Sequence, residues 1–315
     1  AFATPEDNGR QLTFSGADFT ATFDKQSGLL VSYRYKKQEF IHNGQGPRPF
    51  FWRAPIDNDY GARLPVRLKA WKEASYQEPK AENFDIVRGK DSTAVKVTYR
   101  FPQTDARWDI TYKVYSNGVI KVNNHFVAEN AQAPMIPRVG LRMQLPARIT
   151  SLAYYGRGPE ENYRDRRTSQ FFGEYTSDIK DMYEPYVRPQ ENNHRTDIYW
   201  CTLTSKAKEG LLFVADRTFE MNVSNYPLES LDSGDSIENG APRTAKTNHR
   251  HPQAVPSVDF FIDYRMMGIG GDNSWGALAH EPYLIHSGKQ NSISYGFTIV
   301  PFDKKTDFKS LIYQY

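Results

Sequence analysis

Short stretches of alternating apolar and polar residues, separated by turn-forming residues, recur along almost the whole chain and most constrain its fold. The clearest stretch runs from Trp108 to Phe126, with alternation on both sides of Asn117-Gly118. Alternation with a period of two places successive side chains on opposite faces of a strand, and Asn-Gly supplies the positive φ angles of a tight hairpin turn. A second hairpin is expected over residues 19–35. The pattern therefore predicts an antiparallel sheet.

Further strands of the same kind are expected, whereas helix signals are few and short. Strands are predicted at 94–101, 138–145, 198–204, 210–215, 258–264 and 292–300, and helical turns at 69–75 and 178–183. The polar stretch 232–253 is expected to be a surface loop, because strand patterns resume after it. The fold class predicted for residues 1–315 is thus one large all-β domain, an antiparallel sandwich of two packed sheets.

Composition narrows the classes of function. The chain has 40 Lys+Arg against 37 Asp+Glu and no long run of one sign, which speaks against nucleic acid as a partner. No apolar stretch approaches the roughly 20 residues of a membrane span. The lone Cys201 excludes an internal disulfide and is expected to be buried. The first residues lack the features of a signal peptide, yet the compartment stays open.

Two motif-like stretches in the first part of the chain are rich in charged residues. The stretch 51–61 is expected to form a tight non-repetitive loop, which either lines a polar ligand site or simply buries Trp52. In the stretch 155–166, Glu160 and Glu161 are neighbours and point to opposite faces of an extended chain, so they cannot readily flank one bond. A charged loop held by arginine–carboxylate pairs is the favoured interpretation.

Two later stretches combine aromatic residues with turn formers. The stretch 181–192 has two prolines and an aromatic pair, Tyr183 and Tyr186, for which packing on the core is favoured. The stretch 267–276 has glycines that permit sharp turns, followed by Trp275, which either projects as a sugar-stacking surface or fills the core. His249 and His251 lack an evident third ligand, so a metal site is a minor alternative.

Taken in order, these stretches resemble the C-terminal domain, or separate small chain, of long bacterial β-galactosidases of glycoside hydrolase family 2. The resemblance extends from about residue 12 to 301. It rests on W-R-A-P-x-D-N-D-x-G at 52–61, G-x-G-P-x-E-N-Y-x-D-R at 156–166, D-M-Y-x-P-Y-V-x-P-x-E-N at 181–192 and M-G-x-G-G-D-x-S-W at 267–275.

The resemblance implies a large sandwich (a supersandwich) similar to that of galactose mutarotases. It also implies that two catalytic glutamates, together with Mg²⁺ and Na⁺, lie on a separate barrel domain that is absent from this chain. The chain alone is then expected to be inactive and to contain no catalytic residue, metal or cofactor. Its partners would be the barrel and other domains of a homo-oligomeric β-galactosidase and a β-galactoside substrate.

The resemblance also carries roles over to particular positions. Substrate binding is implied for Trp275, with Asp272 and Asn273 beside it. A mobile loop near the active site is implied for Asp57, Asn58, Asp59 and Gly61. The scaffold that holds both loops would comprise Arg53, Glu161, Asn162, Tyr163, Asp165, Arg166, Tyr183 and Tyr186.

Two alternatives stay open. One is a stand-alone mutarotase-like epimerase, which would need a histidine and a carboxylate facing each other across the sandwich cleft. The other is a non-catalytic carbohydrate-binding or structural subunit. The histidines available for the first alternative are His125, His194, His249, His251, His280 and His286.

Overall fold

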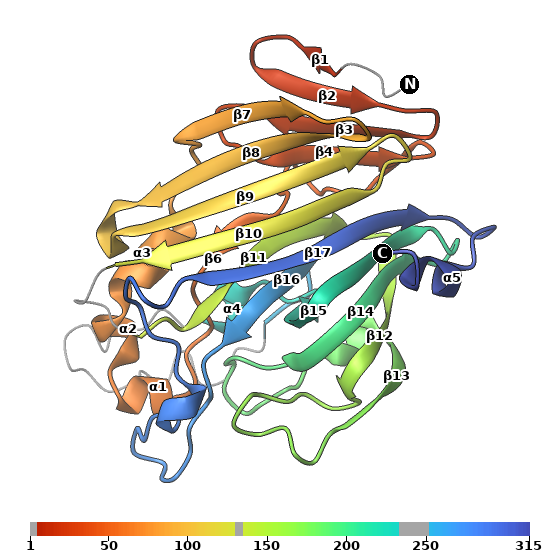
Figure 1. Cartoon of the computed structure of the whole chain (residues 1–315). Helices are drawn as coiled ribbons and strands as arrows, with labels where there is room; N and C mark the ends of the chain where they lie inside the picture. Colours follow the sequence, from red (N-terminus) through yellow and green to blue (C-terminus); the bar gives the residue numbers. More distant parts are fainter. Residues whose placement is uncertain (1–4, 130–134, 233–251) are drawn as a thin grey trace.

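The computed structural model describes residues 5–129, 135–232 and 252–315, and in these residues the chain forms two antiparallel sheets (Figure 1). The first sheet has five strands: β1 (Glu6–Asp7), β2 (Gln11–Ser15), β3 (Phe19–Asp24), β4 (Leu30–Tyr35) and β5 (Gln38–Glu39). This confirms the hairpin expected over residues 19–35, since Phe19 pairs with Tyr35.

The second sheet has twelve strands, nine of them in the order β13-β12-β14-β15-β17-β10-β9-β8-β7. β11 pairs with β16 and β6, and β16 joins β15. Its strands are β6 (Arg48–Phe50), β7 (Asn83–Arg88), β8 (Ser92–Phe101), β9 (Ala106–Tyr115), β10 (Ile120–Ala128), β11 (Arg138–Pro146), β12 (Ile149–Gly158), β13 (Phe171–Asp178), β14 (Arg195–Ser205), β15 (Gly210–Ser224), β16 (Ser257–Met266) and β17 (Ile293–Phe302).

The predicted strands are confirmed, and the clearest hairpin has the expected register. Trp108 pairs with Phe126 across β9 and β10, and Gly118 adopts a positive φ of 88° in the turn. β13 was not predicted because nearly every side chain along this edge strand is exposed or half-exposed, so it shows no alternation with a buried face. The two-sheet, all-β fold class is therefore confirmed.

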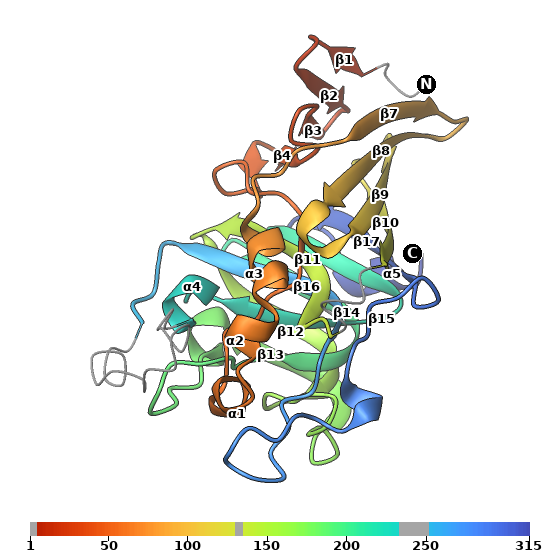
Figure 2. The ribbon, with the colours of Figure 1, turned by 90° about the vertical axis from the view of Figure 1, so that its left-hand side faces the viewer.

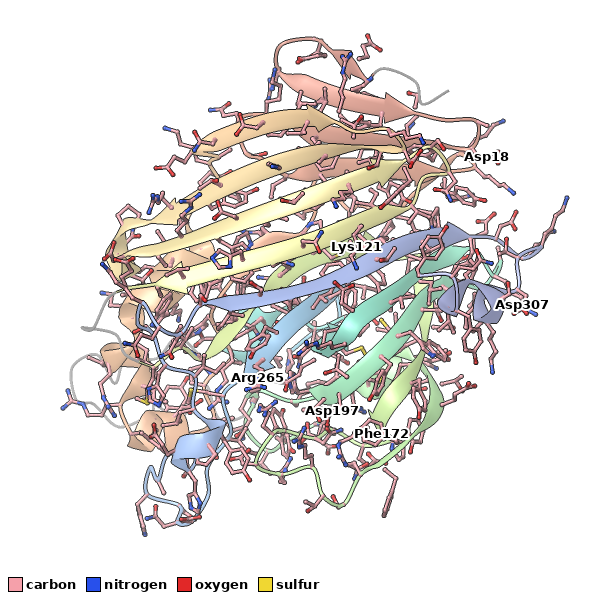
Figure 3. The ribbon with its side chains drawn as sticks, in the orientation of Figure 1. Asp18, Lys121, Phe172, Asp197, Arg265 and Asp307 are labelled. Carbon is pink, nitrogen blue, oxygen red and sulfur yellow. The ribbon has the colours of Figure 1, made fainter. Side chains whose placement is uncertain are left out.

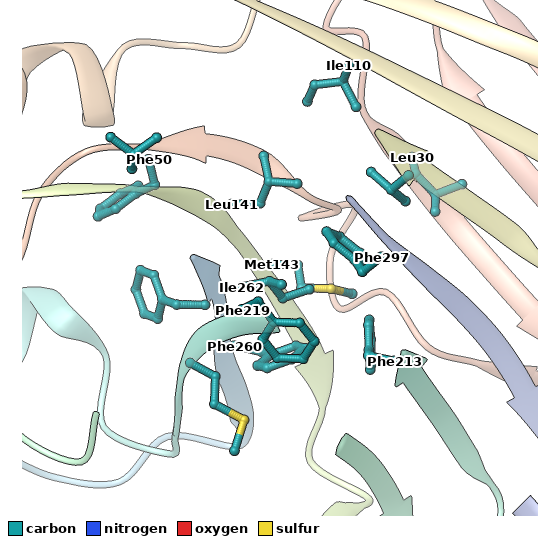
Figure 4. Packing of buried hydrophobic residues seen from close by; sticks show 14 of the residues in the cluster. Leu30, Phe50, Ile110, Leu141, Met143, Phe213, Phe219, Phe260, Ile262 and Phe297 are labelled. Carbon is teal, nitrogen blue, oxygen red and sulfur yellow. The ribbon is translucent and has the colours of Figure 1, made fainter. Parts of the chain in front are cut away.

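The core fills the space between the sheets with apolar and aromatic side chains (Figure 4). The ring of Phe51 packs against several aromatic rings of the core. Its centroid lies 5.1 Å from that of Trp71 and 5.6 Å from that of Trp108. Such pairs add to the free energy gained by burial alone. Cys201 is buried, as predicted.

Short helices lie around the sheets, the first ones along one end and the last one on the opposite side, near the C-terminus (Figures 1 and 2). They are α1 (Asp57–Gly61), α2 (Leu64–Arg67), α3 (Lys69–Tyr76), α4 (Leu228–Leu231), α5 (Phe308–Ile312), and the 3₁₀ turns η1 (Pro102–Thr104), η2 (Ile179–Met182) and η4 (Glu281–Tyr283). The helical turns expected at 69–75 and 178–183 are confirmed as α3 and η2. No helix in the described part of the chain combines the length and apolarity needed to cross a membrane.

The expectation of a non-repetitive loop over residues 57–61 was wrong, since these residues form the helix α1. The reason is local. The side chain of Asp59 accepts a hydrogen bond from the backbone N–H of Ile56 at 3.1 Å, which satisfies a donor that the first helical turn leaves unpaired.

Candidate functional site

A glycine-rich segment, residues 267–276, carries an almost fully exposed indole, and we call this segment the glycine loop. Trp275 is 87% exposed near its end. Gly270, Gly271 and Gly276 have φ angles of 73°, 122° and 103°, which side-chain-bearing residues rarely adopt. The loop lies beside α1 in both views of the ribbon (Figures 1 and 2).

Arg53 holds the beginning of the glycine loop through hydrogen bonds to its backbone. Its guanidinium donates to the carbonyl oxygens of Met267, at 2.7 Å, and Gly268, at 3.2 Å. The same group forms a two-bonded pair with Asp59, at 2.8 and 3.0 Å, and both side chains are buried. Burial opposes the charge, but the Asp59 carboxylate raises the pKa of Arg53 above its ordinary value. The stretch around Trp52 thus fixes the glycine loop, and Trp52 itself is buried.

α1 contacts the end of the glycine loop directly. The amide of Asn58 donates to the backbone oxygen of Asn273 at 3.0 Å. A Cβ atom added at Gly61 would lie 2.8 Å from the Cα atom of Gly276, so the two glycine backbones touch. The side chain of Asn273 in turn accepts from the backbone N–H of Trp275 at 2.9 Å. The close approach of the glycine loop to α1 therefore depends on glycine at both position 61 and position 276.

Asp165 supports the middle of the glycine loop from the other side. Its two carboxylate oxygens accept from the backbone N–H groups of Ile269, at 3.0 Å, and Gly270, at 2.8 Å. Asp272 is exposed and accepts from His280 at 2.6 Å. This hydrogen bond raises the pKa of His280 above its ordinary value.

Glu161 holds together the stretch that carries Asp165. One carboxylate oxygen accepts from Arg166 at 2.7 Å and from the phenol of Tyr186, and the other accepts from the backbone N–H of Asn193 at 2.7 Å. The expected arginine–carboxylate pairing is confirmed at this position. Burial and this hydrogen bond raise the pKa of Tyr186.

The neighbouring residues of this stretch are buried. The side-chain oxygen of Asn162 accepts from the backbone N–H and the hydroxyl of Thr196, at 3.1 and 2.6 Å. Tyr163 stacks on the imidazole of His194 with ring centroids 5.4 Å apart. These contacts fix the backbone on either side of Glu161 and Asp165.

The stretch 181–192 packs against this assembly. Tyr183 is half-buried against the core, and its ring stacks on Tyr226 at 4.1 Å between centroids. Asp57, exposed at the start of α1, accepts from Arg188 at 2.7 Å. Two of the motif stretches therefore hold the glycine loop directly, and the stretch 181–192 supports both of them.

One buried histidine–carboxylate pair bears on the epimerase alternative. The imidazole of His194 lies 3.0 Å from Glu220 and 2.8 Å from the side-chain oxygen of Asn222. Burial opposes its charge, but the hydrogen bond to Glu220 raises the pKa of His194. Because His194 has no exposed surface, this pair presents no imidazole to a ligand.

Metal binding finds no support among the described residues, where no group of three or more His, Cys, Asp or Glu side chains is placed to hold an ion. His249 and His251 lie outside the described residues, as does most of the predicted surface loop 232–253. Arg188 and Gly276 lie in stretches that the sequence singled out, but neither was predicted to be a contact of the site, and His280 was considered only for the epimerase alternative. Arg188 and Gly276 contact residues far away in the chain, Asp57 and Gly61, whereas His280 binds Asp272 of the glycine loop, eight residues before it.

Comparison with known structures defines the class of fold. A galactose mutarotase related enzyme from Lactobacillus acidophilus superimposes over 94% of this chain and 98% of its own, with a TM-score of 0.51 and 10% identity. The chain thus has a galactose mutarotase-like β-sandwich, as expected, and at this identity the likeness extends to the fold alone.

Comparison of sequences gives the family. The family described as "Beta galactosidase small chain" matches residues 15–299, and the chain belongs to it. A β-galactosidase from Priestia megaterium is 33% identical over 298 residues, which are 95% of this chain and 27% of that protein. One from Halalkalibacterium halodurans is 30% identical over 277 residues, 86% of this chain and 26% of that protein. The chain therefore spans about a quarter of these relatives' length.

Proposed function

We propose that this chain is the single C-terminal domain of a glycoside hydrolase family 2 β-galactosidase and that it completes the sugar site of a catalytic barrel. The observation that carries the proposal is the exposed indole of Trp275 on a loop held by Arg53, Asn58 and Asp165. A rigid, exposed aromatic ring suits the apolar C–H face of a sugar. The chain spans about a quarter of the length of the relatives named β-galactosidase, which supports a role as one part of a longer enzyme.

In this proposal the glycine loop and α1 act together at the rim of the site. Asp272 and Asn273 shape the loop and lie beside the substrate, while Gly61 begins a segment that moves as the substrate settles. The contact between Gly61 and Gly276 supports this coupling, because a shift of α1 necessarily pushes on the residue after Trp275.

The chemistry itself is assigned to the barrel. Two glutamates of that domain hydrolyse terminal β-D-galactosides by a retaining mechanism, with Mg²⁺ and Na⁺ bound there. The chain described here then hydrolyses nothing alone and acts within a homo-oligomeric enzyme.

The direct experiment is Trp275→Ala in the full-length enzyme with o-nitrophenyl galactoside and lactose. Loss of one stacking partner is expected to cost about 1–2 kcal/mol of binding and to raise KM accordingly. Tyr313→Ala, which removes another exposed aromatic side chain, serves as the matched control and is expected to have no effect. Unchanged KM and kcat in the Trp275 variant would remove the proposed role.

A second experiment tests whether the chain alone has hydrolytic activity or needs the barrel. The chain is assayed alone and then after mixing with a fragment containing the barrel. Activity only after mixing is expected, and hydrolysis by the chain alone would contradict the assignment of the chemistry to the barrel.

A further inference from the structure

An open cavity of about 890 Å³ lies on the outer face of the twelve-stranded sheet, across β9, β10, β15, β16 and β17. Arg265 and Asp197, two of the residues that line it, are labelled in Figure 3. Its volume is within the range of sites that hold small-molecule ligands. None of its lining residues belongs to the glycine loop.

A glycine leaves room in the floor of this cavity. A Cβ atom added at Gly296 of β17 would lie 2.5 Å from a carboxylate oxygen of Asp216 and 3.0 Å from the side-chain oxygen of Asn123. Glycine inside a strand often marks a place where a ligand or another backbone comes close. The polar side chains on either side are thereby left to face the open space.

Ion pairs line the cavity. Four arginines and four carboxylates line it, and each carboxylate already has a cationic partner. The pairs are Arg164–Glu220 at 3.3 Å, Arg167–Asp197 at 2.6 Å, Arg107–Asp109 at 2.9 Å and Lys121–Asp216. Because every carboxylate is paired, the cavity offers none to a cation, and Arg217 and Arg265 of the lining, which form no ion pair among the described residues, remain as hydrogen-bond donors. The asparagine, threonine and serine side chains of the cavity also offer donors and acceptors suited to hydroxyl groups.

Aromatic rings continue this surface beyond Asp197, and we call the half-buried Tyr155 and the exposed Phe172 and Tyr199 the aromatic shelf. Their ring centroids lie 5.5 to 6.4 Å apart. Arg157 connects the shelf to the cavity, because it pairs with Asp197 at 2.7 Å and lies over the ring of Phe172 at 4.6 Å. Phe172, labelled in Figure 3, is 43% exposed.

We propose that the cavity and the aromatic shelf together bind a linear oligosaccharide. One or two sugar units occupy the cavity through hydrogen bonds to Asn123 and its neighbours, and the following unit stacks on Phe172. Polar groups that fix orientation, next to a flat apolar surface, are the combination that a sugar chain requires. This binding is non-covalent and does not depend on hydrolysis or on Trp275.

The test is a calorimetric titration with β-1,4-galactotetraose of the 315-residue chain and of the full-length enzyme, the latter with its catalytic site saturated beforehand by a non-hydrolysable thio-β-galactoside. Saturable binding to both is expected. Phe172→Ala and Asn123→Ala are each expected to weaken it about five-fold, the effect of losing one stacking contact or one hydrogen-bonding side chain. Thermal melting of each variant verifies that it is folded.

One control locates the ligand. Phe171→Ala removes a 72% exposed ring from the next position of β13, which faces the other side of the sheet, and is expected to leave binding unchanged.

Several results would overturn the proposal. These are no saturable binding to the chain, or binding that Phe172→Ala and Asn123→Ala both leave unchanged. Binding to the chain but not to the full-length enzyme would mean that another domain covers this face, and it too would refute the proposed site.

Discussion

Replacing Arg53 by Met is expected to destabilise the protein far more than the loss of an ordinary ion pair. The side chains of Arg53 and Asp59 are only 2% and 6% exposed, so the substitution leaves an uncompensated carboxylate in the interior. Breaking a buried pair in this way costs about 3–5 kcal/mol. The carbonyl oxygens of Met267 and Gly268 also lose their charged donor.

The expected change in melting temperature follows from the size of the chain. With an unfolding entropy of about 2.1 cal/mol/K per residue, this cost lowers the melting temperature by about 5–8 °C. Arg100→Met is the matched control, because Arg100 pairs with Glu82 at 3.0 Å with both side chains about half exposed. Such exposed pairs contribute about 0.2–1 kcal/mol, which corresponds to less than about 2 °C.

Calorimetry of the two variants measures whether the buried ion pair contributes more to stability than the exposed one. Equal melting temperatures for Arg53→Met and Arg100→Met would refute the reasoning. The double variant Arg53→Met/Asp59→Asn extends the test, since removing both charges is expected to restore part of the lost stability. Strict additivity of the two single substitutions would show that the pair is not energetically coupled.

Three further predictions concern the loop, the buried histidine and the cysteine. Gly276→Ala is expected to cost about 1–3 kcal/mol more than Gly271→Ala in thermal melts, because both have positive φ but only Gly276 touches another backbone. Burial lowers the pKa of His194, but the hydrogen bond to Glu220 outweighs burial and raises this pKa above its ordinary value. Protonated His194 therefore stabilises the fold fully below about pH 6.5, and this stabilisation is lost as the pH rises through the raised pKa. His194→Gln is therefore expected to flatten the melting temperature between pH 6 and 9. Cys201 is buried with a raised pKa, so reaction with a thiol reagent is expected only at the rate of unfolding.

Strand alternation was sufficient to predict the class of fold, because each sheet has one face against the core and one face outward. β9 and β10 show this most clearly, with buried and exposed positions alternating along both strands. β13 could not be found in this way, since at the sheet edge neither of its faces is buried. The helix over 57–61 was not predicted because these residues are mostly turn formers. Its stability comes from the Asp59 cap and from packing on the glycine loop, which only the folded structure shows.

The assembly around the glycine loop explains why its parts stood out in the sequence while their arrangement did not. Arg53 and Asp165 bind backbone groups of the loop, and only residues of that length and charge can do so. Such positions are specific in residue type, whereas core positions accept any apolar side chain of similar size. The partners nevertheless lie 214 residues apart for Arg53 and Met267, and 105 for Gly270 and Asp165. Only the folded sheets bring them together, so a dense polar motif predicts that a shared site exists, and the structure is needed to show which loop the motif holds.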